Sequence, residues 1–147
     1  MKTFLLTALF ATAALAQTPL AAAKNVFVLP MPGGLDQYLA VRLSQDSGFT
    51  VVTKADSADV VLTDQLSPNL DKSLMEAAKA KTEEKSFSRP ATSSFTRGKG
   101  TIFLVDRQTG NVLWSTVEQA KSTATKDLQL AAEHIVERLN KARAPKK

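Results

Sequence analysis

The sequence predicts an α/β protein, a two-layer sandwich with two main helices on one face of a mixed sheet of about five strands. Three observations lead to this fold class. Short runs of β-branched and aromatic residues alternate with stretches in which leucine or alanine recurs every three or four residues. Two of the short runs flank a turn sequence typical of a β-hairpin. The expected order is strand, helix, strand, strand, insert, hairpin, helix.

The first half of the domain begins with residues 25–29, a continuous apolar run typical of a strand buried on both faces. A Pro-Met-Pro-Gly-Gly sequence ends this strand, because proline cannot donate to a ladder and glycine permits a sharp turn. Leucines at positions 35, 39 and 43 then predict a helix, and Gly48 suits the left-handed residue that ends one. Strands are expected at 49–52 and 60–63.

The second half contains an insert at about 67–100, a hairpin and a closing helix. Ser67 and Pro68 can begin a helix, whereas residues 85–100 are rich in Ser, Thr, Gly, Lys and Arg and predict a mobile loop. Strands at 101–105 and 112–117 form the hairpin, in which Asp106 can accept turn N–H groups and Gly110 can take a positive φ. Trp114 is expected in the core, with a partner anchor as the alternative.

The closing helix is expected at about 125–141, because apolar residues there form one packing face, namely Leu128, Ala131, Ala132, Ile135 and Leu139. Residues 143–147 are expected to form a basic tail. The single domain therefore spans 25–142.

Residues 1–16 have the pattern of a cleavable export signal. Lys2 precedes an uncharged apolar stretch that ends Ala14-Leu15-Ala16, with small residues where signal peptidase requires them. The alternative, a membrane anchor, needs about 20 apolar residues, and this run is shorter. We expect cleavage before Gln17, a linker at 17–24, no transmembrane segment afterwards, and an exported protein that is periplasmic or secreted.

Composition limits the mature protein further. The 147 residues include no cysteine, which excludes disulfides and a lipid-bearing cysteine, so the core alone must stabilise the fold. Removing residues 1–16 leaves 131 residues, enough for one core. The formal net charge of +5 falls to +4 with the loss of Lys2. A net charge of this size is informative about association with other molecules but not about the fold.

No catalytic, metal-binding or cofactor site is predicted. His134 is the sole histidine, and a lone histidine beside a packing face is usually structural. Gly33-Gly34 lacks the Lys-Ser/Thr of a phosphate-binding loop. Ser122 and Lys126 are four apart, whereas a Ser–Lys dyad usually shows a spacing of three.

The insert offers a candidate binding segment in which basic and aromatic residues alternate. Such a segment can grip an anionic ligand or polymer, while a simple solvated loop is the alternative. Export disfavours nucleic acid as the ligand. The candidate binding residues are Lys85, Phe87, Arg89, Phe95, Arg97 and Lys99.

Two motifs carry a resemblance to a known group of domains. Ala58-Asp59-Val60-Val61-Leu62-Thr63 and the hairpin Leu104-Val105-Asp106-Arg107-Gln108-Thr109-Gly110-Asn111-Val112-Leu113-Trp114-Ser115, followed by an Ala/Leu-rich helix, resemble the α/β domain of the TolB amino-terminal module and CsgG-type envelope proteins. The resemblance covers roughly 25–66 and 101–142 and implies a bacterial, periplasmic accessory or binding domain. The chain lacks TolB's propeller and the cysteine and membrane hairpins of the CsgG-type channel. These motifs are structural and carry over no catalytic residue.

Three function classes follow. The first is a non-enzymatic interaction module of the cell envelope, whose partner is an unknown envelope protein. The second is a binder of an anionic ligand or polymer through residues 85–99. The third is a small hydrolase with an unrecognised site.

Overall fold

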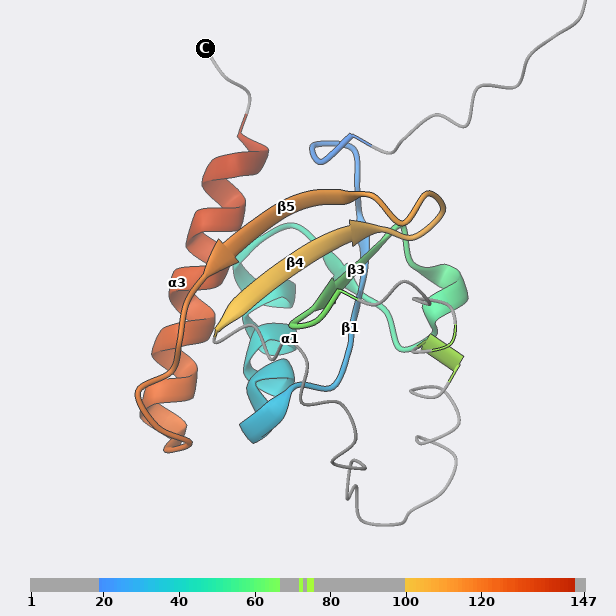
Figure 1. Ribbon diagram of the computed structural model, residues 1–147. Coiled ribbons are helices and arrows are strands. Elements are labelled where there is room, and N and C mark those ends of the chain that lie inside the picture. Colours follow the sequence, from blue (N-terminus) through green and yellow to red (C-terminus); the bar gives the residue numbers. More distant parts are fainter. Residues whose placement is uncertain (1–18, 67–71, 73, 76–99, 145–147) are drawn as a thin grey trace, which may run out of the picture.

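The computed structural model describes residues 19–66, 72, 74–75 and 100–144. In chain order these residues form β1 (Asn25–Val28), α1 (Leu35–Asp46), β2 (Thr50–Val51), β3 (Val60–Thr63), β4 (Thr101–Asp106), β5 (Val112–Val117) and α3 (Thr125–Arg143) (Figure 1). Two short 3-10 turns, Pro32–Gly34 and Ala55–Ser57, join the first elements. The predicted α/β fold class and element order are confirmed.

The described strands form one mixed five-stranded sheet in the order β2-β1-β3-β4-β5. β1 lies between β2 and β3 and is parallel to both, whereas β3, β4 and β5 pair antiparallel. β3 is buried along its whole length, as expected of a central strand. β2 is only two residues long, shorter than the predicted strand at 49–52. The two edges of the sheet are therefore β2 and β5.

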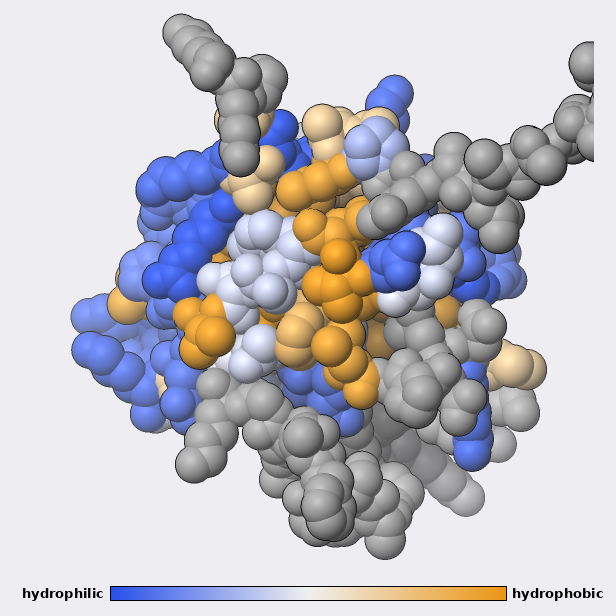
Figure 2. Space-filling model, turned by 45° about the horizontal axis from the view of Figure 1, so that its top comes forward, coloured by the Kyte–Doolittle hydropathy of each residue, from blue (hydrophilic) through white to orange (hydrophobic). Residues whose placement is uncertain are grey.

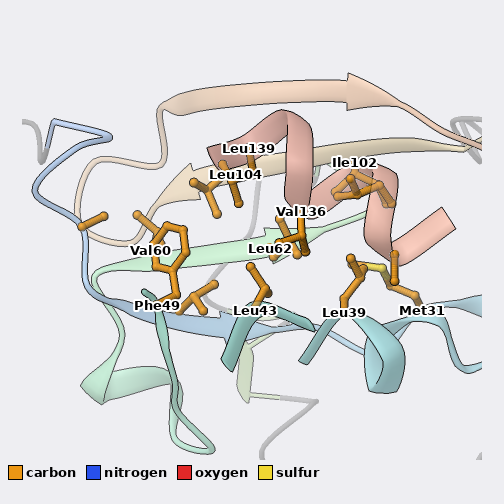
Figure 3. Close-up of a cluster of buried hydrophobic side chains, with 14 residues drawn as sticks. Met31, Leu39, Leu43, Phe49, Val60, Leu62, Ile102, Leu104, Val136 and Leu139 are labelled. Carbon is orange, nitrogen blue, oxygen red and sulfur yellow. The ribbon is translucent and has the colours of Figure 1, made fainter. Parts of the chain in front are cut away.

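The main core lies between the sheet and the two helices. Successive side chains of a strand point to opposite faces, so one set from β1, β3 and β4 meets the helices. Figure 3 shows Leu39 and Leu43 of α1 and Leu139 of α3 in this layer. The strand residues that they meet include Val60, Leu62, Ile102 and Leu104. Both helices cover one face of the sheet, as predicted.

A smaller apolar cluster lies on the opposite face. Phe27 of β1 and Val61 of β3 point away from the helices and are covered by Ala55, which begins the second 3-10 turn, and Ala58, which follows it. Leu74, within the predicted insert, is 2% exposed in this cluster. That residue of the insert is therefore packed. The remainder of the insert lies outside the described residues, apart from Lys72, Met75 and Gly100.

The start of β1 is held by the carboxylate of Asp59, just before β3. Asp59 Oδ2 accepts hydrogen bonds from the backbone N–H groups of Lys24 (3.0 Å) and Asn25 (2.8 Å). Ala23, in the segment predicted to be a linker, is fully buried in the main core. The packed domain therefore begins earlier than residue 25, because these bonds hold the preceding chain against the core.

The turn of the β4–β5 hairpin is built as its sequence predicts. Asp106 is fully buried, and its Oδ1 accepts from the backbone N–H groups of Gln108 (2.9 Å) and Thr109 (2.8 Å). Gly110 has a φ of 71°, which a side chain would disfavour. Asp106 therefore stabilises the tight connection between the two strands.

Two predicted boundaries at the end of α3 are wrong by a short distance. α3 continues to Arg143, past the expected end at 141, so Arg143 belongs to the helix and not to a tail. The reason is tertiary packing, because the Arg143 side chain binds the end of α1 and the segment before β1.

None of the helices in the described part of the chain is long and apolar enough to span a membrane.

Candidate functional site

The six candidate binding residues predicted from the sequence lie outside the described residues. They are Lys85, Phe87, Arg89, Phe95, Arg97 and Lys99. The candidate site that the fold assembles was not predicted as a specific set of residues. It comprises the outer edge of β5 and, at one end of that edge, a cluster of polar side chains from α3 and from the residue that follows β5.

The hydrogen-bond alternation of β5 leaves one row of backbone groups facing away from β4. Glu118 N donates to Gly100 O over 2.8 Å, which makes these two residues a hydrogen-bonded pair. Hydrogen-bonded pairs recur at every second residue of an antiparallel ladder, so Thr116 also bonds inward, to Ile102. The N–H and C=O groups of Ser115 and Val117 therefore point outward. Within the described residues, no strand lies beyond β5.

A β-bulge interrupts β5 near its start. Leu104 is opposite Trp114 and Val105 is opposite Val112, so Leu113 is an extra residue on the β5 side. Leu113 and Trp114 are half-buried and both pack against the main core, so the tryptophan lies at the border of the core and not within it as predicted. A bulge increases the twist of an edge strand, so the regular part of this edge runs from Trp114 to Val117.

Exposed apolar side chains lie along β5, beside its outward-facing backbone groups. Val112 and Val117 are 44% and 65% exposed, and Ser115 between them is also exposed. Figure 2 brings the β5 side of the molecule forward and shows apolar surface in the middle of this view, with surface of intermediate hydropathy and hydrophilic surface beside it. The outer edge of a strand, with exposed β-branched residues beside it, is the geometry to which another extended chain can add.

Three side chains form a cluster at the Val117 end of the edge, here called the Arg138 cluster: Glu118, His134 and Arg138. Glu118 Oε1 lies 3.0 Å from His134 Nδ1, and its Oε2 lies 2.9 Å from Arg138 Nη2. Arg138 Nη1 also donates to the outward carbonyl oxygen of Val117, over 2.9 Å. The second contact of that nitrogen is Thr116 Oγ1, at 3.2 Å. α3 thereby reaches one end of the exposed edge directly.

His134 and Arg138 are the members of the cluster that are accessible to solvent. The side chains of His134 and Arg138 are 42% and 46% exposed, whereas that of Glu118 is only 18% exposed. The carboxylate therefore lies beneath an imidazole and a guanidinium that both meet solvent. The carboxylates of Glu133 and Glu137 on the same helix are 54% and 59% exposed, so the surface here carries charges of both signs.

Two neighbouring carboxylates of α3 each form an ion pair with a basic residue outside the cluster. Glu133 lies 3.1 Å from Arg42 Nη2, and Glu137 lies 2.8 Å from Lys141 Nζ. The hydrogen bond and charge of Lys141 lower the pKa of Glu137. The carboxylate that contacts Arg138 is thus that of Glu118, which Arg138 shares with His134.

Ser122, which the sequence places four residues before Lys126, contributes to the start of α3. Ser122 Oγ donates to Asp127 Oδ2 over 2.6 Å and accepts from Ala124 N, so it supports the first turn of α3. Among the described residues, no group of three or more His, Asp or Glu side chains could hold a metal ion.

A sequence signal for the Arg138 cluster did exist. His134 and Arg138 are four residues apart and so share one face of α3, and Glu118 directly follows the last residue of β5. Which strand α3 would lie against could not be read from the spacing alone.

Comparison with known proteins found no matching family model, no matching curated protein and no matching solved structure.

Proposed function

We propose that this protein is an exported, non-enzymatic binding module that captures an extended segment of another envelope protein at the outer edge of β5. The observation that carries the proposal is the row of outward backbone groups at Ser115 and Val117, beside the exposed side chains of Val112 and Val117. The carbonyl oxygen of Val117 already accepts from Arg138. An added strand would satisfy the outward groups of Ser115 and the N–H of Val117 by main-chain hydrogen bonds and would cover the valines. Export and an envelope partner come from the signal-like residues 1–16.

Binding of this kind depends on backbone geometry more than on any one side chain. The outer N–H of Ser115 makes no bond to β4, so its loss leaves the ladder intact. Proline is tolerated on an edge strand where the N–H faces outward, and its ring then occupies the space an added strand needs. Ser115→Pro therefore separates capture of a partner from folding.

The experiment compares the mature wild-type chain with Ser115→Pro and Ser115→Ala. Each is immobilised and exposed to the cell-envelope extract of its own source, and partners are identified by cross-linking and mass spectrometry. Ser115→Ala keeps the N–H and is expected to retain a partner that Ser115→Pro loses, with equal circular dichroism spectra. Retention of every specific partner by a folded Ser115→Pro would overturn capture at this edge.

A further inference from the structure

We infer that Arg138 is an autoinhibitory residue of the β5 edge: its guanidinium occupies the outward carbonyl of Val117 in the free protein and must move away before a partner strand can pair along the whole edge. This inference rests on the proposed function and adds the regulation of that same site. The contact that carries it is the hydrogen bond from Arg138 Nη1 to Val117 O, 2.9 Å long. Arg138 therefore competes with an added strand for one of the acceptors that the strand needs.

The carbonyl of Val117 belongs to the row of groups that an added strand would use. Val117 bonds outward because its neighbours Thr116 and Glu118 bond inward to β4. In an added antiparallel strand, the residue opposite Val117 would accept from its N–H and donate to its carbonyl oxygen. That donor would lie about 2.9 Å from the oxygen, the distance at which Arg138 Nη1 already lies. The two donors therefore compete for the same acceptor.

The guanidinium of Arg138 is held at the strand by two further acceptors. Its Nη2 lies 2.9 Å from Glu118 Oε2, and its Nη1 also donates to Thr116 Oγ1 over 3.2 Å. The carboxylate of Glu118 is itself only 18% exposed, and its other oxygen lies 3.0 Å from His134 Nδ1. A carboxylate fixed in this way limits the rotamers of the arginine that it pairs with. The contact with Val117 is thus the resting arrangement of the free protein.

The same contact is able to open. The side chain of Arg138 is 46% exposed, so its guanidinium passes into water on release, and an ion pair with that exposure is weak. The outward groups of the exposed Ser115 remain available for a first hydrogen bond. Native proteins protect sheet edges with charged side chains against accidental pairing. Arg138 therefore admits a partner that forms enough main-chain bonds to displace it and disfavours weaker pairing.

The test uses an uncharged strand, a capped heptapeptide of alternating threonine and valine, titrated to millimolar concentration into the mature protein. Binding is followed by NMR shifts of the Ser115 and Val117 amides. Arg138→Ala is expected to bind the peptide about five- to tenfold more tightly than the wild type, because the Val117 carbonyl no longer has a competing donor. Glu118→Gln, which keeps the backbone bond to Gly100 and weakens the anchor, is expected to give a smaller gain. Thermal unfolding shows that each variant is folded.

Salt and a matched charge variant separate this effect from net charge. High salt screens the exposed ion pair between Arg138 and Glu118, so the wild type is expected to gain about twofold in affinity relative to Arg138→Ala between low and high salt. Arg42→Ala is the matched control. It removes the same charge from pairs with Asp46 and Glu133 on the helix layer, and it is expected to bind the uncharged peptide as the wild type does.

The outcomes separate autoinhibition from capture. Binding by the wild type that is equal to or tighter than binding by Arg138→Ala would overturn the autoinhibitory role and leave capture at β5 standing. An equal gain in Arg42→Ala would assign the effect to net charge and also overturn the inference. Binding by Arg138→Ala and not by the wild type would support it in its strongest form. Binding by neither at β5 would contradict capture at this edge, and with it the inference.

Discussion

Arg143 Nη1, at the end of α3, donates to the carbonyl oxygen of Ser47, directly after the last residue of α1, over 2.6 Å. Its Nη2 donates to Ala23 O over 2.9 Å, and its Cζ lies 3.9 Å from the centre of the Phe49 ring. Burial lowers the pKa of Arg143, although an arginine stays protonated at neutral pH. One side chain thus connects both helices to the segment before β1.

Replacing this arginine is expected to loosen the helix layer. Arg143→Ala should lower the free energy of unfolding by about 2 kcal/mol, because two hydrogen bonds from a charged donor and a cation–π contact are lost together. Urea denaturation measures this loss. Arg42→Ala is the control, since its ion pairs are exposed and worth less than about 1 kcal/mol. Equal losses for both variants would contradict a special role for Arg143.

Gly100 lies where the chain enters β4, close to the end of β5. It has a φ of 74°, and a Cβ placed there would lie 2.6 Å from the carbonyl oxygen of Glu118. Gly100→Ala is therefore expected to cost about 3 kcal/mol, from an unfavourable φ together with a backbone clash.

Gly48→Ala is the matched control for this substitution. Gly48 has a φ of 64°, but a Cβ added there would meet nothing within 4 Å, so only the strain of the positive φ applies, about 1 kcal/mol. Thermal unfolding of the two variants isolates the contribution of the clash. A smaller loss at Gly100 than at Gly48 would mean that β4 and β5 separate easily at this end.

Export is a separate prediction from residues 1–16. Expression of the full chain in a bacterium should give a processed species outside the cytoplasm that begins at Gln17, because Ala14 and Ala16 satisfy the small-residue requirement. Intact-mass measurement of the fractionated protein determines the start. A membrane-bound species that retains Met1 would contradict both the cleavage and the proposed location.

Local sequence patterns predicted the parts of this fold that depend on local interactions. Leu39 and Leu43 are both buried on one face of α1, as their spacing indicates. Asp106 and Gly110 form the hairpin turn because their contacts are with residues a few positions away.

The missed features depend on contacts between distant segments. Arg143 looked like part of a tail because its partners, Ser47 and Ala23, are far away in the sequence. Arg138 was missed for the same reason, since only the packing of α3 beside β5 brings it to Val117. Spacing identifies the face of a helix, and the tertiary fold determines what that face meets.

The most direct test of the account is amide hydrogen exchange, resolved by NMR, in the free mature protein. Thr116 and Glu118 should be protected, because their N–H groups point to β4, and the Glu118 bond to Gly100 O is 2.8 Å long. Ser115 and Val117, whose N–H groups point outward, should exchange at least about tenfold faster than these neighbours. Equal protection at all four amides would mean that the edge of β5 is already covered, and would contradict its proposed role as the binding site.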